Sequence, residues 1–569
     1  MKLNKNIWFY ILFLVFALPS WLIQNDRVIN VDEPRWIVRG ANFYYAVTHG
    51  EFEKTIFEYH PGVTNMWIVG TAMHIYFPEY RGMGQGYFDP LKTKFEEFIR
   101  ENDKDVLEIV RISRWLHTGV LAAFFLIALF LLSKLVDIKV AFLSVLLAAV
   151  SPFYLGHSRL MNLEGMLAIF VLVSLLGLYI YTNKEKNLFF LILSGVCFGL
   201  AQLTKSSSIV LLGTVGIVFL ISIFKKNEEL FYSKLLGGIR TFLIWFVSAV
   251  ITYFVLWPGM WVAPVKMVSE VYGNAFSYAF QGARLDVKEE LAPESFNVET
   301  DNNGALNFAE KWMSSTTIVS WLGLLLVVVF LMQKDSLAFS IKDAIGYLFL
   351  LAISFMVLFG LAQGRDSQHY ILSSYVAFDV IAGIGWGSAL LWVEARWKGL
   401  ASTTASVVVL VVITLAQIGF GLPYAPYYFT YKNPFAKEAA TYGYGEGFSE
   451  AADYLAQKPN AKELTAYVYN GMGTFSYFFP GKTIVLKRAN VLYGDFVTIT
   501  DELRSSDYLV LYPIVREKQP ETEKIFSELE GVVKPEKVIY INGLEYIQIY
   551  KVTDIPETVY EKLLAKNEP

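Results

Sequence analysis

A few acidic, basic and histidine side chains interrupt the long apolar stretches of this chain, and these are the positions where chemistry is possible. They are Asp32, Glu33, His60, Arg159, Glu164, Lys205, Arg365 and His369. Carboxylates can act as general bases, whereas guanidinium and ammonium groups both bind phosphate. The residue types therefore indicate proton transfer and anion binding.

The acidic pair also has a purely structural interpretation, which the sequence leaves open. Adjacent carboxylates point in different directions on a regular backbone, so at most one of Asp32 and Glu33 can face a given substrate. Asp32 could equally cap a short helix that has Pro34 near its first turn. A capping role and a catalytic role do not exclude each other.

The remaining positions have structural alternatives of the same kind. His60 stands in a His-Pro-Gly turn at the start of an apolar stretch. Arg159 could pair with Glu164 and join two neighbouring spans, and Lys205 could be a lone lysine whose ammonium reaches water along its apolar stem. Glu164 is expected inside the membrane boundary, where a carboxylate is a functional candidate by default.

The elements that must position these residues are membrane helices. The 569 residues are 54% hydrophobic and 18% charged, against about 25% charged in soluble domains. Runs long enough to cross a bilayer, about 17–25 residues, recur up to Gly421. Eleven spans are predicted, at about 7–23, 112–133, 139–156, 162–182, 188–203, 206–224, 238–257, 316–333, 343–362, 370–393 and 400–421. We interpret the first as an uncleaved anchor rather than a signal peptide, because Pro19-Ser20-Trp21 is a poor cleavage site.

The lysine and arginine bias of the short loops sets the orientation. With a cytoplasmic N-terminus, the inner segments carry fourteen of these residues, and the short outer loops carry only Arg159, Lys205 and Arg365. A twelfth span at His60–Phe77 would reverse this bias, so we expect a re-entrant or interfacial helix there. Three cations on the disfavoured side indicate an anion at the outer surface, and a phosphate fits.

This topology divides the chain into two predicted domains. Residues 1–425 form a membrane domain with large outer loops at 24–111 and 258–315, and residues 426–569 form an extracytoplasmic α/β domain. Its strands are predicted in ELTAYVYN, KTIVLK, SDYLVLYP, EKVIYING and LEYIQIYKV, and its helices in EGFSEAADYLAQ and ETEKIFSELE. The glycine-rich GYGEGF turn precedes the first of these helices, where it could bind an anion or simply start the helix.

Other function classes find little support in the composition. The net charge is -4, and no basic block indicates nucleic-acid binding. The single cysteine, Cys197, lies in an apolar run, so neither a disulfide framework nor a Cys/His metal cluster can be built. No cofactor is expected, and a divalent metal held by other ligands stays an open alternative.

Taken in order, the motifs resemble those of the GT-C superfamily of glycosyltransferases. Asp-Glu follows the first span, His-Pro comes later in the first outer loop, and Ser-Arg with a downstream acid fills the next outer turn. This pattern is similar to the protein O-mannosyltransferase group (glycosyltransferase family 39) and its bacterial relatives, including lipid A aminoarabinose transferases. Two departures, HPGVTN in place of His-Pro-Pro and Glu164 in place of aspartate, leave the acceptor open.

The resemblance implies an inverting transfer of a sugar, mannose-like, from a polyprenyl- or dolichyl-phosphate carrier to an acceptor hydroxyl at the outer face. It implies Asp32 as the catalytic base with Glu33 beside it, and maps the His-Pro motif to His60 and the Ser-Arg motif to Arg159, with Glu164 as its acid. Arg365 is the preferred phosphate ligand, with Lys205 and Arg159 next. The acceptor is a protein, a lipid or a polysaccharide. The alternative function is a transporter or lipid-linked sugar flippase, for which the sequence offers no internal repeat.

Overall fold

The structure, a computed structural model, describes residues 6–224, 231–281, 304–333, 339–362, 367–396, 403–436 and 443–565. The chain forms two compact units. The first comprises Met1–Ile23, Gly40–Gln85 and Ser113–Ala439, and the second comprises Gln24–Arg39, Gly86–Ile112 and Ala440–Pro569. The second unit therefore takes in two segments that the sequence analysis assigned to the first outer loop of the membrane domain.

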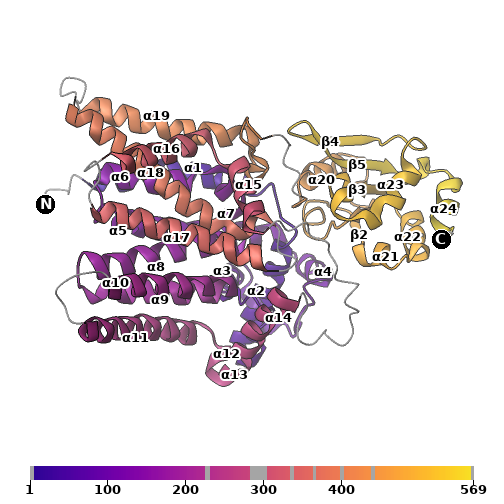
Figure 1. Cartoon of the computed structure of the whole chain (residues 1–569). Helices are drawn as coiled ribbons and strands as arrows, with labels where there is room; N and C mark the ends of the chain where they lie inside the picture. The colour runs from indigo at the N-terminus through magenta and orange to yellow at the C-terminus, as the bar shows by residue number, and fades with distance from the viewer. Residues whose placement is uncertain are drawn as a thin grey trace. The chain divides into compact units, whose positions relative to one another are not determined.

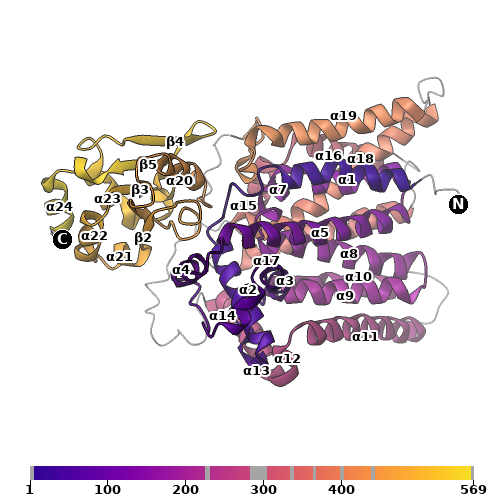
Figure 2. The same cartoon turned by 180° about the vertical axis from the view of Figure 1, so that it is seen from behind.

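The first unit is a bundle of apolar helices, several of which lie side by side (Figure 1). Figure 2 shows the opposite side, with α1 and α5 in front. The helices with residues in this unit are α1 (Ile7–Leu22), α2 (Glu33–Thr48), α3 (Val63–Tyr76), α5 (Val106–Ser133), α6 (Ile138–Ala149), α7 (Pro152–Ser158), α8 (Leu163–Asn183), α9 (Leu188–Thr204), α10 (Val210–Phe224), α11 (Phe231–Leu256), α12 (Gly259–Val262), α13 (Pro264–Val268), α14 (Asn274–Gln281), α15 (Ala305–Ser315), α16 (Ile318–Met332), α17 (Phe339–Leu361), α18 (Leu372–Arg396) and α19 (Thr403–Gly421). Helices α2 and α5 also contribute residues to the second unit.

These helices make the chain an integral membrane protein with several spans. Among the described residues, six helices are long and apolar enough to cross a bilayer, and eight spans result if two bent helix pairs each count as one. Each of the eleven predicted segments coincides with a helix or a bent pair, but α1, α9 and the stretch that contains α10 are shorter than this criterion requires. The count of eleven spans and the orientation of the termini therefore stay predictions. Helix α3 has only 14 residues, fewer than the roughly 20 that a straight crossing needs.

Glycines allow the central helix α18 to approach its neighbours closely. A Cβ atom on Gly383 would overlap the backbone of Ser144 on α6, and one on Gly387 would lie 2.7 Å from Cα of Val140 on the same helix. On another side of α18, a Cβ on Gly385 would overlap the carbonyl oxygen of Gly323 on α16. Small residues at helix contacts are the usual means of packing membrane helices, because lipid supplies no hydrophobic drive for association.

The second unit contains a mixed five-stranded sheet in the order β2-β1-β3-β5-β4. Strands β1 (Thr465–Tyr469), β2 (Lys482–Leu486) and β3 (Tyr508–Leu511) are parallel, and β5 (Leu544–Lys551) pairs antiparallel with β3 and with β4 (Lys537–Ile541). Asn542-Gly543, with φ of 51° and 81°, forms the hairpin turn that the Asn-Gly pair favours. The remaining helices are α4 (Lys94–Glu101), α20 (Phe448–Ala456), α21 (Arg488–Leu492), α22 (Phe496–Arg504), α23 (Glu523–Leu529) and α24 (Glu557–Leu564). The strands and helices predicted for the tail lie at the expected positions.

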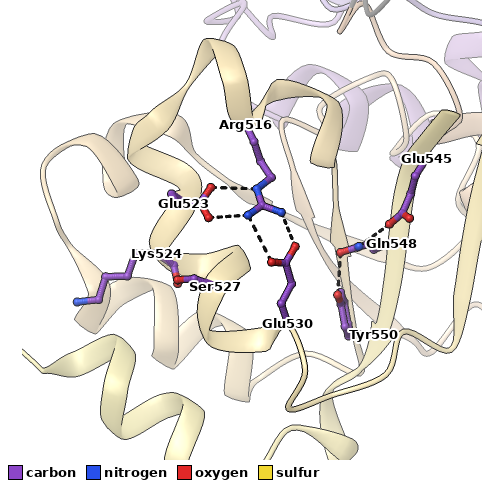
Figure 3. A network of polar contacts seen from close by, with 8 residues as sticks. All are labelled: Arg516, Glu523, Lys524, Ser527, Glu530, Glu545, Gln548 and Tyr550. Carbon is purple, nitrogen blue, oxygen red and sulfur yellow. Dashed lines mark hydrogen bonds and ion pairs between the residues drawn. The ribbon is translucent and has the colours of Figure 1, made fainter.

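A fork of charge-assisted hydrogen bonds fixes the start and end of α23 (Figure 3). Arg516 donates from Nε and Nη2 to the two carboxylate oxygens of Glu523, at 3.0 and 2.5 Å, and from Nη1 to Glu530. Beside it, Gln548 on β5 accepts from Tyr550 at 2.7 Å and donates to Glu545. The hydrogen bonds from Arg516 hold the pKa of Glu523 below its usual value of 4.5. Desolvation opposes this shift, and the positive charge of Arg516 adds to it.

We predict that Gly383→Leu lowers the melting temperature of the purified protein in detergent, because the added side chain forces α18 away from α6. Overpacking of this kind costs about 1–3 kcal/mol or more. The matched control is Gly346→Leu on α17, where nothing lies within 4 Å of an added Cβ. Equal melting temperatures for the two variants would contradict close packing at Gly383.

We also predict that the stabilising effect of Arg516 depends on pH. Because the folded pKa of Glu523 is lowered, its contribution is present above the unfolded pKa, about 4.3, and is lost as the pH falls through the folded value. Amides of α23 should exchange with deuterium faster in Arg516→Ala than in the unmodified chain at pH 7, and this difference should shrink as the pH falls and Glu523 is protonated. The control is Lys458→Ala, which removes an ion pair with Glu536 and should leave α23 unchanged; a difference that does not shrink as the pH falls would refute the mechanism.

Candidate functional site

The tight turn between α7 and α8 places Glu164 in the first turn of α8. Asn162 caps this helix by accepting a hydrogen bond from the Glu164 backbone N–H at 3.3 Å. Gly165 lies so close to the preceding helix that a Cβ there would stand 2.7 Å from Cα of Ser158. The local sequence therefore turns the carboxylate of Glu164 inward, where its residue is only 3% exposed.

Lys205, at the end of α9, forms a buried ion pair with Glu164. Its Nζ donates to Oε1 of Glu164, and both side chains are 4% exposed. The interpretation of Lys205 as a lone lysine that reaches water is therefore wrong. Burial of two charges costs several kcal/mol for each ion and is offset only by good geometry and further hydrogen bonds. An ion pair in so apolar a body is consequently a weak device for stability and a good candidate for function.

Two histidines and a tyrosine surround this pair. Nε2 of His369 lies 3.8 Å from Oε1 of Glu164, and the rings of His369 and His157 are 5.4 Å apart. The ammonium of Lys205 stands 4.6 Å from the ring centroid of Tyr370, which is within the range of a cation–π contact. His369 and Tyr370 both belong to the short 3-10 helix Gln368–Ile371. Of the residues predicted from the sequence, Glu164, Lys205 and His369 are thus brought together.

The His60 turn is bound to the same end of α9. Nδ1 of His60 is 3.0 Å from the hydroxyl of Ser206, and the Gly62 backbone N–H donates to the carbonyl oxygen of Thr204 at 3.1 Å. Gly62 has a φ of 61° as it precedes α3, a conformation that favours glycine. Helix α3 is also tied to the α7–α8 turn, since the amide of Asn65 donates to Met161 at 2.7 Å. His60 therefore contacts Ser206, the residue that follows Lys205 in the sequence.

Arg159 binds elsewhere in the first unit. Its Nε donates to the carbonyl oxygen of Trp21 at 3.0 Å, and its Nη2 donates to that of Ile23. The guanidinium also lies 5.0 Å from the ring centroid of Tyr428. Arg159 thus satisfies carbonyls at the end of α1, and the alternative of an Arg159–Glu164 pair is replaced by the Lys205–Glu164 pair. A role for Arg159 in phosphate binding stays a prediction.

Asp32 and Glu33 belong to the second unit and differ in exposure. The side chain of Asp32 is 48% exposed and lies 3.7 Å from Arg35, whereas Glu33 is only 1% exposed. The cap at the start of α2 comes from Asn30, whose Oδ1 accepts from the backbone N–H groups of Asp32 and Glu33 at 2.8 and 3.0 Å. Asp32 is therefore the more exposed member of the pair, and Asn30 supplies a side-chain cap at the start of α2.

Arg365, the preferred phosphate ligand of the sequence analysis, lies outside the described residues. Its assignment stays a prediction. No group of three or more His, Cys, Asp or Glu side chains that could hold a metal ion occurs among the residues that the structure describes.

Two neighbouring cavities open beside the His60 turn. The smaller, of about 120 Å³, is lined by Tyr59, His60, Ser206 and Ser207 among others. The larger, of about 320 Å³, is almost wholly apolar and lies between α9, α10, α11 and the segment around Tyr272. Ile209, Tyr272 and Phe276 line both cavities.

The sequence analysis did not select Gln202 or Tyr272, which hydrogen-bond to each other at 2.6 Å in the wall of the larger cavity. It also passed over His157 and Tyr370. An uncharged polar side chain in an apolar run, such as Gln202 or Tyr272, does not stand out in the sequence. His157 and Tyr370 were indicated only by the HSR and QHY patterns in which they occur.

Residues 110–270 match the family described as dolichyl-phosphate-mannose-protein mannosyltransferase. This segment includes Arg159, Glu164 and Lys205. The resemblance to the protein O-mannosyltransferase group is confirmed for this part of the chain. A comparison with curated protein sequences finds no match.

Several solved structures are similar to the chain at low identity. ArnT from Cupriavidus metallidurans bound to undecaprenyl phosphate shares 13% identity over 96% of this chain and 98% of that one, with a TM-score of 0.48. The Archaeoglobus fulgidus oligosaccharyltransferase tethered with an acceptor peptide shares 12% identity over 96% of this chain and 74% of that one, with a TM-score of 0.48. The S. cerevisiae protein O-mannosyltransferase Pmt1-Pmt2 complex bound to the sugar donor shares 15% identity over 46% of this chain and 35% of that one, with a TM-score of 0.34. Because all three TM-scores are below 0.5, these similarities by themselves establish neither fold nor function.

We predict that Glu164→Gln destabilises the protein by about 3–5 kcal/mol, because it leaves the ammonium of Lys205 buried without its carboxylate partner. The double variant Glu164→Gln/Lys205→Met should recover much of this loss, since it removes both charges. The control is Glu51→Gln, which breaks an exposed pair with Lys54 and should cost no more than about 1 kcal/mol. Thermal unfolding in detergent measures all three, and a double variant at least as destabilised as Glu164→Gln alone would contradict the coupling.

Proposed function

We propose that this chain is an inverting glycosyltransferase that transfers a mannose-like sugar from a polyprenyl- or dolichyl-phosphate carrier to an acceptor hydroxyl at the outer face of the membrane. The observation that carries the proposal is the buried cluster of Lys205, Glu164 and His369. Ser206, which follows Lys205 in the sequence, lines a small cavity that shares three residues with a larger, apolar one. The match of residues 110–270 to a family named for a dolichyl-phosphate-linked donor supports the same assignment.

The proposed donor is an amphiphile, and the two cavities suit its two ends. The smaller cavity has His60, Ser206 and Ser207 in its wall, and therefore offers donors to a phosphate or a sugar hydroxyl. The larger cavity offers an apolar surface to the part of the polyprenyl chain next to the phosphate. Burial of apolar area contributes about 25 cal/mol per Å². The polyprenyl chain of the donor therefore supplies affinity, while the polar wall positions its phosphate and sugar.

In the proposed reaction, the acceptor hydroxyl attacks the anomeric carbon from the face opposite the phosphate. The new bond joins the acceptor oxygen to the anomeric carbon, and the bond from that carbon to the phosphate oxygen breaks with its electron pair. The carrier lipid leaves as its phosphate. The transition state resembles an oxocarbenium ion, as in glycoside hydrolysis. Lys205 is proposed to stabilise the charge that develops on the leaving phosphate.

Asp32 is proposed as the base that accepts the proton of the acceptor hydroxyl. Its side chain is 48% exposed, and its neighbour Glu33 is buried. A base must reach its substrate, so accessibility favours Asp32 over Glu33 for this role. The guanidinium of Arg35 lies 3.7 Å from the carboxylate of Asp32. Glu33 is proposed to hold the start of α2 in place.

We predict that Asp32→Ala lowers the release of lipid phosphate from a radiolabelled polyprenyl-phosphate mannose by about 10²–10⁴-fold, the range that general base catalysis contributes. The purified full chain is assayed with native membranes as the source of acceptor. Binding of the polyprenyl phosphate itself should be unchanged. Asp26→Asn, another exposed carboxylate of the second unit, is the matched control and should keep full activity.

Normal turnover in the Asp32→Ala variant would end the assignment of the base. A different result tests the proposal as a whole: if the unmodified chain moves the labelled lipid across vesicle membranes without cleaving it, the protein is a carrier and not a transferase.

A further inference from the structure

A sharp corner joins α15 to α16 in the first unit. The two helices are bent by 115° at the break between them. Helix α16 is apolar, whereas α15 is amphipathic, with Phe308 and Trp312 buried and Glu310 exposed. An amphipathic helix that continues a membrane helix at such an angle lies in the plane of the lipid headgroups. A corner of this kind is typical of the membrane–water boundary.

Aromatic contacts support this placement. The rings of Trp312 and Trp321 are 5.2 Å apart across the corner, and the indole N–H of Trp321 donates to the carbonyl oxygen of Met313 at 3.4 Å. Tryptophan is enriched at the level of the headgroups, because its ring is apolar and its N–H is polar.

A cavity of about 870 Å³ opens at this corner. Its polar wall includes Lys311 and Ser314 of α15, and Lys432 and Asn433 of the segment after α19. Its apolar wall includes Trp321 and Leu322 of α16 and Phe435, and Leu322 and Phe435 are 44% and 82% exposed. The cavity thus has a polar wall and an apolar wall, and is large enough for a lipid headgroup.

The polar wall is firmly built. Asn433 donates from its side chain to the carbonyl oxygens of Met313 at 2.6 Å and Thr316 at 3.3 Å, and from its backbone to that of Ser314 at 2.9 Å. These bonds hold Lys432 against the end of α15, where its ammonium donates to the hydroxyl of Ser314 at 2.8 Å. With Lys311 and Lys432 against the single carboxylate of Glu310, the charges in the wall sum to a positive excess.

We propose that this cavity binds an anionic membrane lipid, whose phosphate lies between Lys311 and Lys432 and whose acyl chains lie along Trp321 and Leu322. Two ammonium groups beside a neutral amide and a hydroxyl match a phosphodiester, and the exposed apolar side chains require an occupant with a tail. A zwitterionic lipid offers the same tail, but its headgroup adds a further positive charge beside the two lysines. This site goes beyond the proposed function and does not depend on it.

A simpler role for Lys432 is to complement the negative end of the α15 dipole. That role needs only Lys432 and predicts nothing for Lys311, which lies one turn before the end of the helix. The two interpretations are therefore separated by Lys311.

The test is a titration of the purified full chain by native mass spectrometry, with phosphatidylglycerol and phosphatidylcholine of the same acyl chains. The unmodified chain should bind phosphatidylglycerol more tightly. Lys311→Gln and Lys432→Gln should each weaken it by about fivefold, and the double variant by about 30-fold. The double variant Lys311→Arg/Lys432→Arg keeps the charge and should bind normally, which separates a lost site from a lost fold.

Three results would overturn the proposal. The control Lys266→Gln removes an exposed lysine of α13 that is paired with Glu53; if it weakens binding as much, the attraction is a general effect of surface charge. Equal affinity for the two lipids would show that the lysines do not select an anion. If soluble glycerol phosphate competes as well as phosphatidylglycerol does, the occupant is a free phosphate ester and not a lipid.

Discussion

The buried ion pair between Lys205 and Glu164 is the interaction on which the candidate site in the first unit depends. Each charge would be costly in an apolar body, and each is tolerated because the other is in contact with it. The pair also joins segments far apart in sequence, since Glu164 begins α8 and Lys205 ends α9. His369 approaches the same carboxylate from the start of α18. The carboxylate of Glu164 therefore contacts residues from two other helix ends, which the short turns of the chain do not connect to it.

Close helix packing is what keeps these ends in place. Gly165, Gly383 and Gly387 each stand where a Cβ would meet the backbone of the neighbouring helix. At such contacts the helices have little freedom to rotate or slide, because the atoms of one backbone fill the space left by the other. The polar side chains at the helix ends are consequently held at fixed positions. Polar groups placed on packed helices are more precise than groups placed on loops.

The polar and apolar features of the first unit are paired in space, and this pairing suggests amphiphilic ligands. His60 and Ser206, next to Lys205 in the sequence, line a cavity that shares residues with a larger, apolar one, and the corner between α15 and α16 combines two lysines with exposed apolar side chains. A soluble phosphate ester would make no contact with the apolar walls that contributes to binding, and a neutral lipid would have no charge to pair with the cations. The chemistry of both places thus favours molecules that carry a phosphate at one end and a hydrocarbon chain at the other.

Much of the fold was determined by the sequence alone, because the signals that carry it are local. Runs of apolar residues mark the membrane helices, and alternating strands with an Asn-Gly turn mark the sheet of the second unit. The residues of the site were also visible as charges at disfavoured positions. Glu164, Lys205 and His369 were among the selected residues, but the contacts between them were not predicted. The partners of these residues were decided only by tertiary structure. Arg159 lies five residues from Glu164 and binds the end of α1 instead, while Lys205, forty-one residues away, reaches the carboxylate. Charge pairing follows distance in space, and that distance is set by how the helices pack, which no local pattern encodes.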